Sequence, residues 1–121
     1  MITCFWVALG GAIGSVLRYL VGLININDSV IFPYKTLIIN IVGSLIIGIT
    51  VALAGKYSNA DANVILFLKV GICGGFTTFS TFALESFGLV HDGRLWAAVL
   101  YILLSVLLSI GAVFLGQVIV K

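Results

Sequence analysis

The sequence predicts an all-α membrane protein in which four transmembrane helices form a single domain over residues 1–121. The chain is 62% hydrophobic and 8% charged, whereas soluble domains are about 45–50% apolar. Its mean hydropathy is +1.31. Four apolar segments also reach the length of about 20 residues that crosses a bilayer, and they lie at residues 2–24, 36–55, 63–90 and 95–120.

The first segment, residues 2–24, is expected to remain in the protein as a spanning helix. It lacks the basic leading region of a signal peptide. Gly10, Gly14 and Gly22 recur at multiples of four residues, with Arg18 at the remaining step. Small residues let helices approach each other closely in a membrane, so these glycines are expected mainly to pack helices together.

The second and fourth segments carry the polar residues of a candidate transport path. Asn40 lies near the start of the second segment. Tyr101, Ser105 and Ser109 recur every four residues in the fourth segment, so they share one face of the helix. A lone membrane serine usually bonds to its own helix backbone. Several polar residues on one stripe favour a polar groove instead, and a bundle this small needs a partner subunit to close it.

The third segment, residues 63–90, contains the stretch GICGGFTTFSTFALES, which predicts a break near residues 73–79. The adjacent glycines Gly74 and Gly75 are expected to let the helix unwind. A continuous helix of this length would measure about 42 Å, more than the hydrocarbon core of about 30 Å, so an unwound section can be accommodated. Carbonyl groups freed near Gly74 and Thr77 must be satisfied within the bilayer, and they can hold a small bare cation.

The chemistry of this path favours an anion. The break is rich in hydroxyl groups, which belong to Thr77, Thr78, Ser80 and Thr81. Hydroxyl and amide donors suit an anion, whereas a cation path needs carboxylates or rows of carbonyls, and only Glu85 stands near the path. Phe79 and Phe82 lie about one helical turn apart, and aromatic rings have a positive edge that can contact an anion. Ordinary core packing is the alternative interpretation of the two rings.

Flanking charges leave the orientation in the membrane open. With four spans, Lys56 and Lys121 lie on one side, and Lys35 and Arg94 lie on the other. The positive-inside rule normally produces an excess of basic residues on one side. The near balance is explained either by the small size of the chain or by insertion in both orientations with antiparallel pairing.

Several functional classes are excluded. Cys4 and Cys73 have no metal-binding spacing, His91 stands beside Asp92 without further ligands, and no nucleophile–base pair is visible. We therefore expect no enzymatic activity. The net charge of +2 is too small and too scattered to indicate nucleic acid as a partner, so membrane lipid is the expected environment.

Three motifs together resemble the Fluc (CrcB) family of fluoride ion channels: GGAIGSVLRY at residues 10–19, TLIINIVGSLIIG at 36–48 and GGFTTFSTFALE at 74–85. The resemblance covers nearly the whole chain. It implies an antiparallel, dual-topology homodimer with two pores, located as a multi-pass protein in the prokaryotic plasma (inner) membrane. The implied function is passive fluoride efflux, which lowers cytoplasmic fluoride.

The resemblance also implies roles for individual residues. The implied pore lining comes from three segments and consists of Asn40, Phe79, Phe82, Tyr101, Ser105 and Ser109. A structural sodium ion is implied at the dimer centre, held by main-chain oxygens of Gly74 and Thr77. Arg18 is expected either to draw anions to the pore mouth or to tie its helix end to the interface. Glu85 receives no assigned role.

Two other functions are compatible with the size of the chain. A small multidrug-type exporter also has four helices and dual topology, but that class uses a glutamate in the first helix, where this chain has Arg18. A non-transporting assembly subunit would explain the glycine packing but not the donor residues. Passive fluoride efflux from vesicles without a proton gradient separates the three functions.

Overall fold

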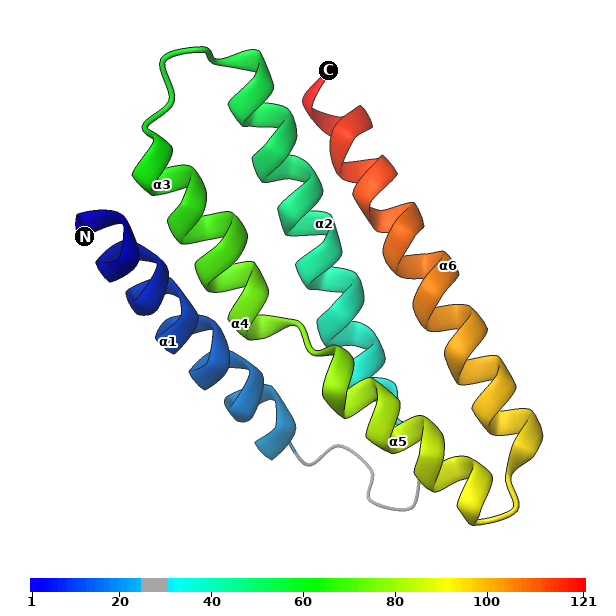
Figure 1. Cartoon of the computed structure of the whole chain (residues 1–121). Coiled ribbons are helices and arrows are strands. Elements are labelled where there is room, and N and C mark those ends of the chain that lie inside the picture. Colours follow the sequence, from blue (N-terminus) through cyan, green and yellow to red (C-terminus); the bar gives the residue numbers. More distant parts are fainter. Residues whose placement is uncertain (25–30) are drawn as a thin grey trace.

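Figure 1 shows the computed structural model, which describes residues 1–24 and 31–121. Its elements in chain order are α1 (Ile2–Leu23), α2 (Tyr34–Lys56), α3 (Ala62–Leu66), the π-helix η1 (Phe67–Cys73), α4 (Gly74–Phe76), α5 (Phe79–His91) and α6 (Leu95–Val120). Four segments are long and apolar enough to cross a membrane, and one of them comprises α3 to α5. The prediction of four spanning helices is confirmed, and the described residues contain no strand.

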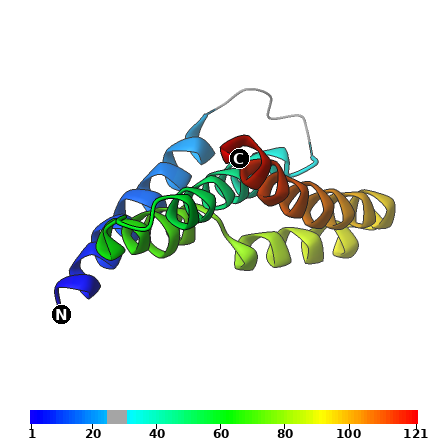
Figure 2. The same cartoon turned by 90° about the horizontal axis from the view of Figure 1, so that it is seen from above.

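The third membrane segment, α3 to α5, changes its neighbours along its length. Its earlier part, η1 and α4, packs mainly against α1, whereas α5 packs against α6. The most extensive helix contact is between α2 and α6, which run side by side (Figure 1). Seen from above in Figure 2, α5 lies beside α6 and away from α1. The segment therefore crosses from one side of the fold to the other.

Small residues allow the close contacts between these helices. Gly10 and Gly14 are buried against η1, and a Cβ on either glycine would collide with a carbonyl oxygen of that helix. Gly48 has the same role between α2 and α6, because a Cβ there would stand 2.6 Å from a carbonyl oxygen of α6. Gly22 faces open space among the described residues, so the expected packing role holds for some of the spaced glycines and not for all.

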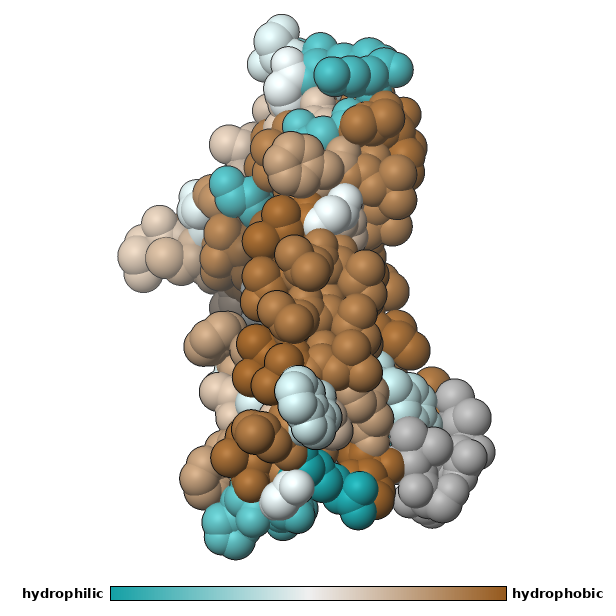
Figure 3. Space-filling model, turned by 90° about the vertical axis from the view of Figure 1, so that its right-hand side faces the viewer, coloured by the Kyte–Doolittle hydropathy of each residue, from teal (hydrophilic) through white to brown (hydrophobic). Residues whose placement is uncertain are grey.

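The single chain buries little of its apolar surface. Its accessible surface is 7687 Å², whereas a compact soluble protein of 12.8 kDa would expose about 6,300 Å². The buried hydrophobic cluster is small and consists of Leu37, Leu89, Ala98 and Tyr101. Figure 3 shows a continuous hydrophobic band between hydrophilic ends. This distribution fits a surface that faces the hydrocarbon core of a bilayer.

The main chain is extended between α4 and α5. Thr77 has φ −81° and ψ 158°, and Thr78 has φ −150° and ψ 119°. The expectation that the glycines themselves unwind is wrong, because Gly74 has helical φ −64° and ψ −38° and Gly75 lies within α4. Gly75 is needed for close packing instead, since a Cβ there would stand 2.5 Å from the Gly11 oxygen.

The π-helix η1 precedes this extended stretch and was not predicted from the sequence. In a π-helix the hydrogen bonds connect residues i and i+5, and such turns are frequent at functional sites. In this chain η1 lies between α1 and α2, and its C-terminal end leads directly into α4. The third segment therefore departs from a regular α-helix in two places, the π-helix at Phe67–Cys73 and the extended residues Thr77 and Thr78, with the short helix α4 between them.

Candidate functional site

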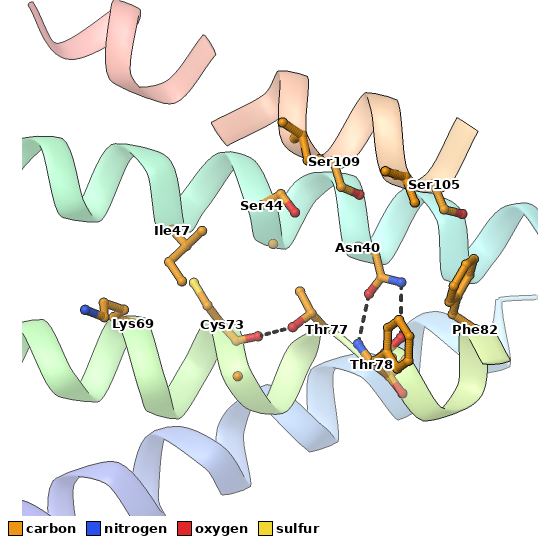
Figure 4. A pocket seen from close by; sticks show the side chains of 15 residues that line it. Asn40, Ser44, Ile47, Lys69, Cys73, Thr77, Thr78, Phe82, Ser105 and Ser109 are labelled. Atoms are coloured by element: carbon orange, nitrogen blue, oxygen red, sulfur yellow. Dashed lines mark hydrogen bonds between the residues drawn. The ribbon is translucent and has the colours of Figure 1, made fainter. Parts of the chain in front are cut away.

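A groove with a cavity volume of about 430 Å³ lies between α2, the third membrane segment and α6 (Figure 4). Most of the predicted pore and ion-binding residues line it, namely Asn40, Gly74, Thr77, Thr78, Phe79, Phe82, Ser105 and Ser109. The other predicted site residues do not line it, namely Arg18, Ser80, Thr81, Glu85 and Tyr101. The structure thus brings together residues from three segments that are distant in the sequence.

Asn40 clamps the extended stretch from the opposite wall of the groove (Figure 4). Its Nδ2 donates to the Thr78 carbonyl oxygen at 3.2 Å, and its Oδ1 accepts from the Thr78 N–H at 2.9 Å. A side-chain amide can pair with a peptide group in this way because it carries one acceptor and two N–H donors. The clamp satisfies both main-chain groups of Thr78, and one N–H of Asn40 is left for another acceptor.

The hydroxyl groups of Thr77 and Thr78 stabilise the ends of α4 and α5. Thr77 Oγ1 donates to the Cys73 carbonyl oxygen at 2.8 Å. Thr78 is the N-cap of α5: its Oγ1 accepts from the Thr81 N–H at 3.1 Å and donates to Thr81 Oγ1 at 3.0 Å. Ser80 Oγ lies 3.4 Å from the same hydroxyl. These hydroxyls are therefore engaged in local structure: Thr78 caps the start of α5, and Thr77 bonds back to the carbonyl four residues earlier, as Ser and Thr often do in helices.

Two main-chain carbonyls beside the groove lose the donors that a continuous helix would supply. The Gly74 oxygen would accept from the Thr78 N–H, which is bonded to Asn40. The Thr77 oxygen would accept from the Thr81 N–H, which is bonded to the Thr78 hydroxyl. The Gly75 oxygen, which lies between them, accepts from Arg18 Nε at 3.2 Å. Arg18 therefore ties α1 to the end of α4.

Ser105 and Ser109 contribute unpaired hydroxyl groups to the groove. Both side chains lie on the side of α6 that faces the groove in Figure 4. Their Oγ atoms are buried, and neither has a hydrogen-bond partner among the residues that the structure describes. Buried polar atoms in proteins are usually bonded, so each exception needs a physical explanation. An ion or water that passes along the groove would supply the missing partner.

The aromatic residues form a connected row at one end of the groove. The ring centroids of Phe79 and Phe82 are 5.5 Å apart, and those of Phe82 and Tyr101 are 5.3 Å apart. Phe82 packs against the buried cluster, whereas Phe79 is 79% exposed on the single chain. Tyr101 is fully buried, and its hydroxyl donates to Glu85 Oε1 at 3.0 Å. Tyr101 and Glu85 thus form a pair behind the groove lining.

Some residues of the groove were missed by the sequence analysis. Gly43 and Ser44 line it from α2, and Lys69 and Cys73 line it from η1. A Cβ on Gly43 would collide with the Thr77 side chain, so this glycine leaves room for the extended stretch. Lys69 could have been found from the sequence, because ionisable residues within membrane segments commonly mark ion pathways.

The chain matches the family described as CrcB-like protein, Camphor Resistance (CrcB), over residues 5–117. It is 49% identical over 117 residues to the fluoride-specific ion channel FluC of Agrobacterium fabrum, covering 96% of this chain and 94% of the relative. It is 50% identical over 116 residues to the fluoride-specific ion channel FluC 1 of Nitrobacter hamburgensis, covering 95% of this chain and 92% of the relative. It is 43% identical over 122 residues to the fluoride-specific ion channel FluC of Flavobacterium psychrophilum, covering 100% of this chain and 98% of the relative.

These matches confirm the resemblance that three sequence motifs indicated. The relatives are named as ion channels and not as enzymes, which agrees with the expectation of a protein without catalytic activity. They extend over nearly the full length of this chain and come from bacteria, and the fold supplies the spanning helices. The chain is therefore a multi-pass bacterial membrane protein that belongs to the CrcB family.

Proposed function

We propose that this chain forms a fluoride-selective channel that lets fluoride leave the cell passively and so lowers its cytoplasmic concentration. The observation that carries the proposal is the pair of unpaired buried hydroxyls, Ser105 and Ser109, in a groove whose wall includes Phe79 and Phe82. The relatives named as fluoride-specific channels support the identity of the ion.

The groove fits a small, strongly hydrated anion. Moving an unpaired ion into a dry site costs far more than moving a polar group, so the path must replace the water that it removes. Ser105 and Ser109 offer O–H donors, and the second N–H of Asn40 offers another. The ring edges of Phe79 and Phe82 add weaker positive contacts beside these donors.

We propose that a second, antiparallel copy completes two such paths. Phe79 is 79% exposed although it lines the groove, which leaves its ring available to a partner subunit. Gly74 is exposed as well, and a Cβ there would meet nothing within 4 Å among the described residues. The balanced flanking charges, with Lys56 and Lys121 opposite Lys35 and Arg94, favour insertion in both orientations.

The proposed dimer would hold a structural sodium ion between the two extended stretches. The residues fit a hard cation, because the Gly74 and Thr77 carbonyls have lost their helical donors to Asn40 and to Thr78. A two-fold axis in the membrane plane would bring these carbonyls together from both copies, and oxygen ligands suit hard cations. We propose that the extended stretch is a functional break and that bound sodium would add positive charge close to the anion path.

Fluoride efflux from reconstituted vesicles tests the proposed function. The purified protein is placed in vesicles loaded with potassium fluoride, and external fluoride is measured with an electrode after a potassium ionophore removes the opposing voltage. We expect rapid fluoride release without a proton gradient and no comparable release of chloride. Release that requires a proton gradient would favour an exporter. The absence of fluoride release from vesicles with folded protein would favour an assembly subunit and contradict the channel.

A further inference from the structure

Lys69 is the charged residue of the groove. It lies in η1, and the residues that line the groove with it are otherwise apolar or neutral. The side chain of Lys69 is exposed and forms neither a salt bridge nor a hydrogen bond with any part of the chain in residues 1–24 and 31–121. An ammonium group without a partner carries its full charge into the space beside it, so Lys69 dominates the electrostatic potential at its end of the groove.

The position of Lys69 along the groove is distinct from that of the aromatic row. In Figure 4 Lys69 lies at the opposite end of the groove from Asn40 and Phe82. Its ammonium group points away from Cys73, toward the start of the third membrane segment. Long basic side chains within membrane segments extend toward the nearer interface. Lys69 therefore stands where the groove opens toward the side of the membrane that holds the loop after α2.

We propose that Lys69 concentrates anions at this mouth of the groove and so raises the rate at which they enter the path. The inference rests on the proposed channel function. It adds a charged residue at the groove mouth to the neutral hydrogen-bond donors proposed for the path. A charge in a cleft with low-dielectric walls raises the local concentration of the opposite ion, and basic side chains select anions in pores. In an antiparallel pair, one Lys69 would serve each side of the membrane.

The test measures fluoride efflux for Lys69→Gln and Lys69→Arg in vesicles of zwitterionic lipid. Lys56→Gln is the matched control, because it removes the same charge on the same side of the protein but outside the groove, where Lys56 Nζ donates to the Val120 oxygen. Each variant is measured at about 10 mM and about 1 M of sodium isethionate at equal concentration inside and outside the vesicles, so that the potassium ionophore sets the same voltage in both cases; the Debye lengths are about 30 Å and about 3 Å.

We expect Lys69→Gln to reduce the initial flux about fivefold at low salt, the factor that one unit charge gives at about 4 Å in water. The difference should fall below about twofold at high salt, where the charge is screened. Lys69→Arg should conduct like the parent because it keeps the charge, and Lys56→Gln should do the same because its lysine lies outside the groove.

A second measurement keeps the proposal testable if Lys69→Gln folds poorly. Lys69→Cys, in a background that lacks Cys4 and Cys73, is treated with thiosulfonate reagents of similar size that attach either an ammonium or a sulfonate group. We expect higher flux with the cation than with the anion.

Several outcomes would overturn the proposal. They are equal flux for parent and Lys69→Gln at low salt, an equal loss at both salt concentrations, an equal loss in Lys56→Gln, and equal flux after the two reagents. A loss that appears only in vesicles with anionic lipid would assign Lys69 to a lipid phosphate instead. If the parent itself releases no fluoride, the proposed channel function fails and this inference fails with it. If the parent conducts and the Lys69 variants conduct at the same rate, only the role of Lys69 is refuted.

Discussion

Replacement of Asn40 separates its structural contacts from its role in the path. Asn40 holds the N–H and the C=O of Thr78 at 2.9 Å and 3.2 Å. In Asn40→Leu the new side chain has a volume similar to that of asparagine but forms neither hydrogen bond. The N–H and the C=O of Thr78 therefore lose their partners. An unsatisfied buried group costs about 1–3 kcal/mol, which gives about 2–6 kcal/mol for the pair. Because Asn40 is only half-buried and water can enter the groove, we expect the lower end, about 2–3 kcal/mol.

Asn40→Asp distinguishes the two roles because it keeps only half of the clamp. An aspartate can still accept from the Thr78 N–H but, when ionised, cannot donate to the Thr78 oxygen. We expect a smaller loss of stability than for Asn40→Leu, about 1–2 kcal/mol. We nevertheless expect fluoride flux to stop, since a negative charge would stand in the path of an anion.

The assay combines the midpoint of denaturant unfolding in detergent with fluoride efflux from vesicles. Ser44→Ala is the control for stability, because Ser44 lies one turn further along α2 and lines the same groove. The expected order of stability is parent, then Asn40→Asp, then Asn40→Leu. If Asn40→Leu unfolds at the parent midpoint and conducts like the parent, then neither the clamp nor the donor role of Asn40 is correct.

Three further predictions follow from the groove and the proposed dimer. Phe82→Ile and Phe79→Ile should remain dimeric by size-exclusion chromatography but lose fluoride flux at least about tenfold, because they keep apolar bulk and lack the ring quadrupole; dimers that conduct normally would show that the rings only pack. A single cysteine placed in the loop after Lys56, without Cys4 and Cys73, should react only in part with an impermeant thiol reagent added to intact cells, and the remaining fraction should react after the membrane is permeabilised; complete labelling of intact cells, or none before permeabilisation, would contradict dual topology. Prolonged exchange of sodium for a bulky organic cation should reduce flux, and indifference to this exchange would argue against a central sodium ion.

The spanning helices were predictable because they depend on local composition. Length and hydropathy are properties of contiguous residues, and they located each segment close to its observed bounds. The motif GGFTTFSTFALE includes Thr77 and Thr78, where the main chain is extended, and a functional break at this stretch stays a proposal. The residues at which the main chain becomes extended were not predictable from glycine content, since Gly75 is required by its close approach to α1 and not by an unusual backbone angle.

The contacts that arrange the site depend on tertiary structure. Asn40 pairs with Thr78, Arg18 bonds to the Gly75 oxygen, and the sequence separations are 38 and 57 residues. Spacing within one helix cannot identify such pairs. The regular spacing of Tyr101, Ser105 and Ser109 indicated a shared face of α6, but Tyr101 bonds to Glu85 behind the groove while the two serines line it. Shared faces are therefore predictable, whereas the neighbour that each residue meets is not.

The most direct test of the conduction path is fluoride efflux through the double variant Ser105→Ala/Ser109→Ala. Both hydroxyls are buried without a partner among the described residues, so their removal should not destabilise the folded chain. If they replace the water around a passing anion, their loss should lower fluoride flux at least about tenfold, which corresponds to about 1.4 kcal/mol of lost stabilisation for the ion in the path. We therefore predict a dimer with the parent unfolding midpoint and strongly reduced efflux. A double variant that folds normally and releases fluoride at the parent rate would contradict conduction through this groove.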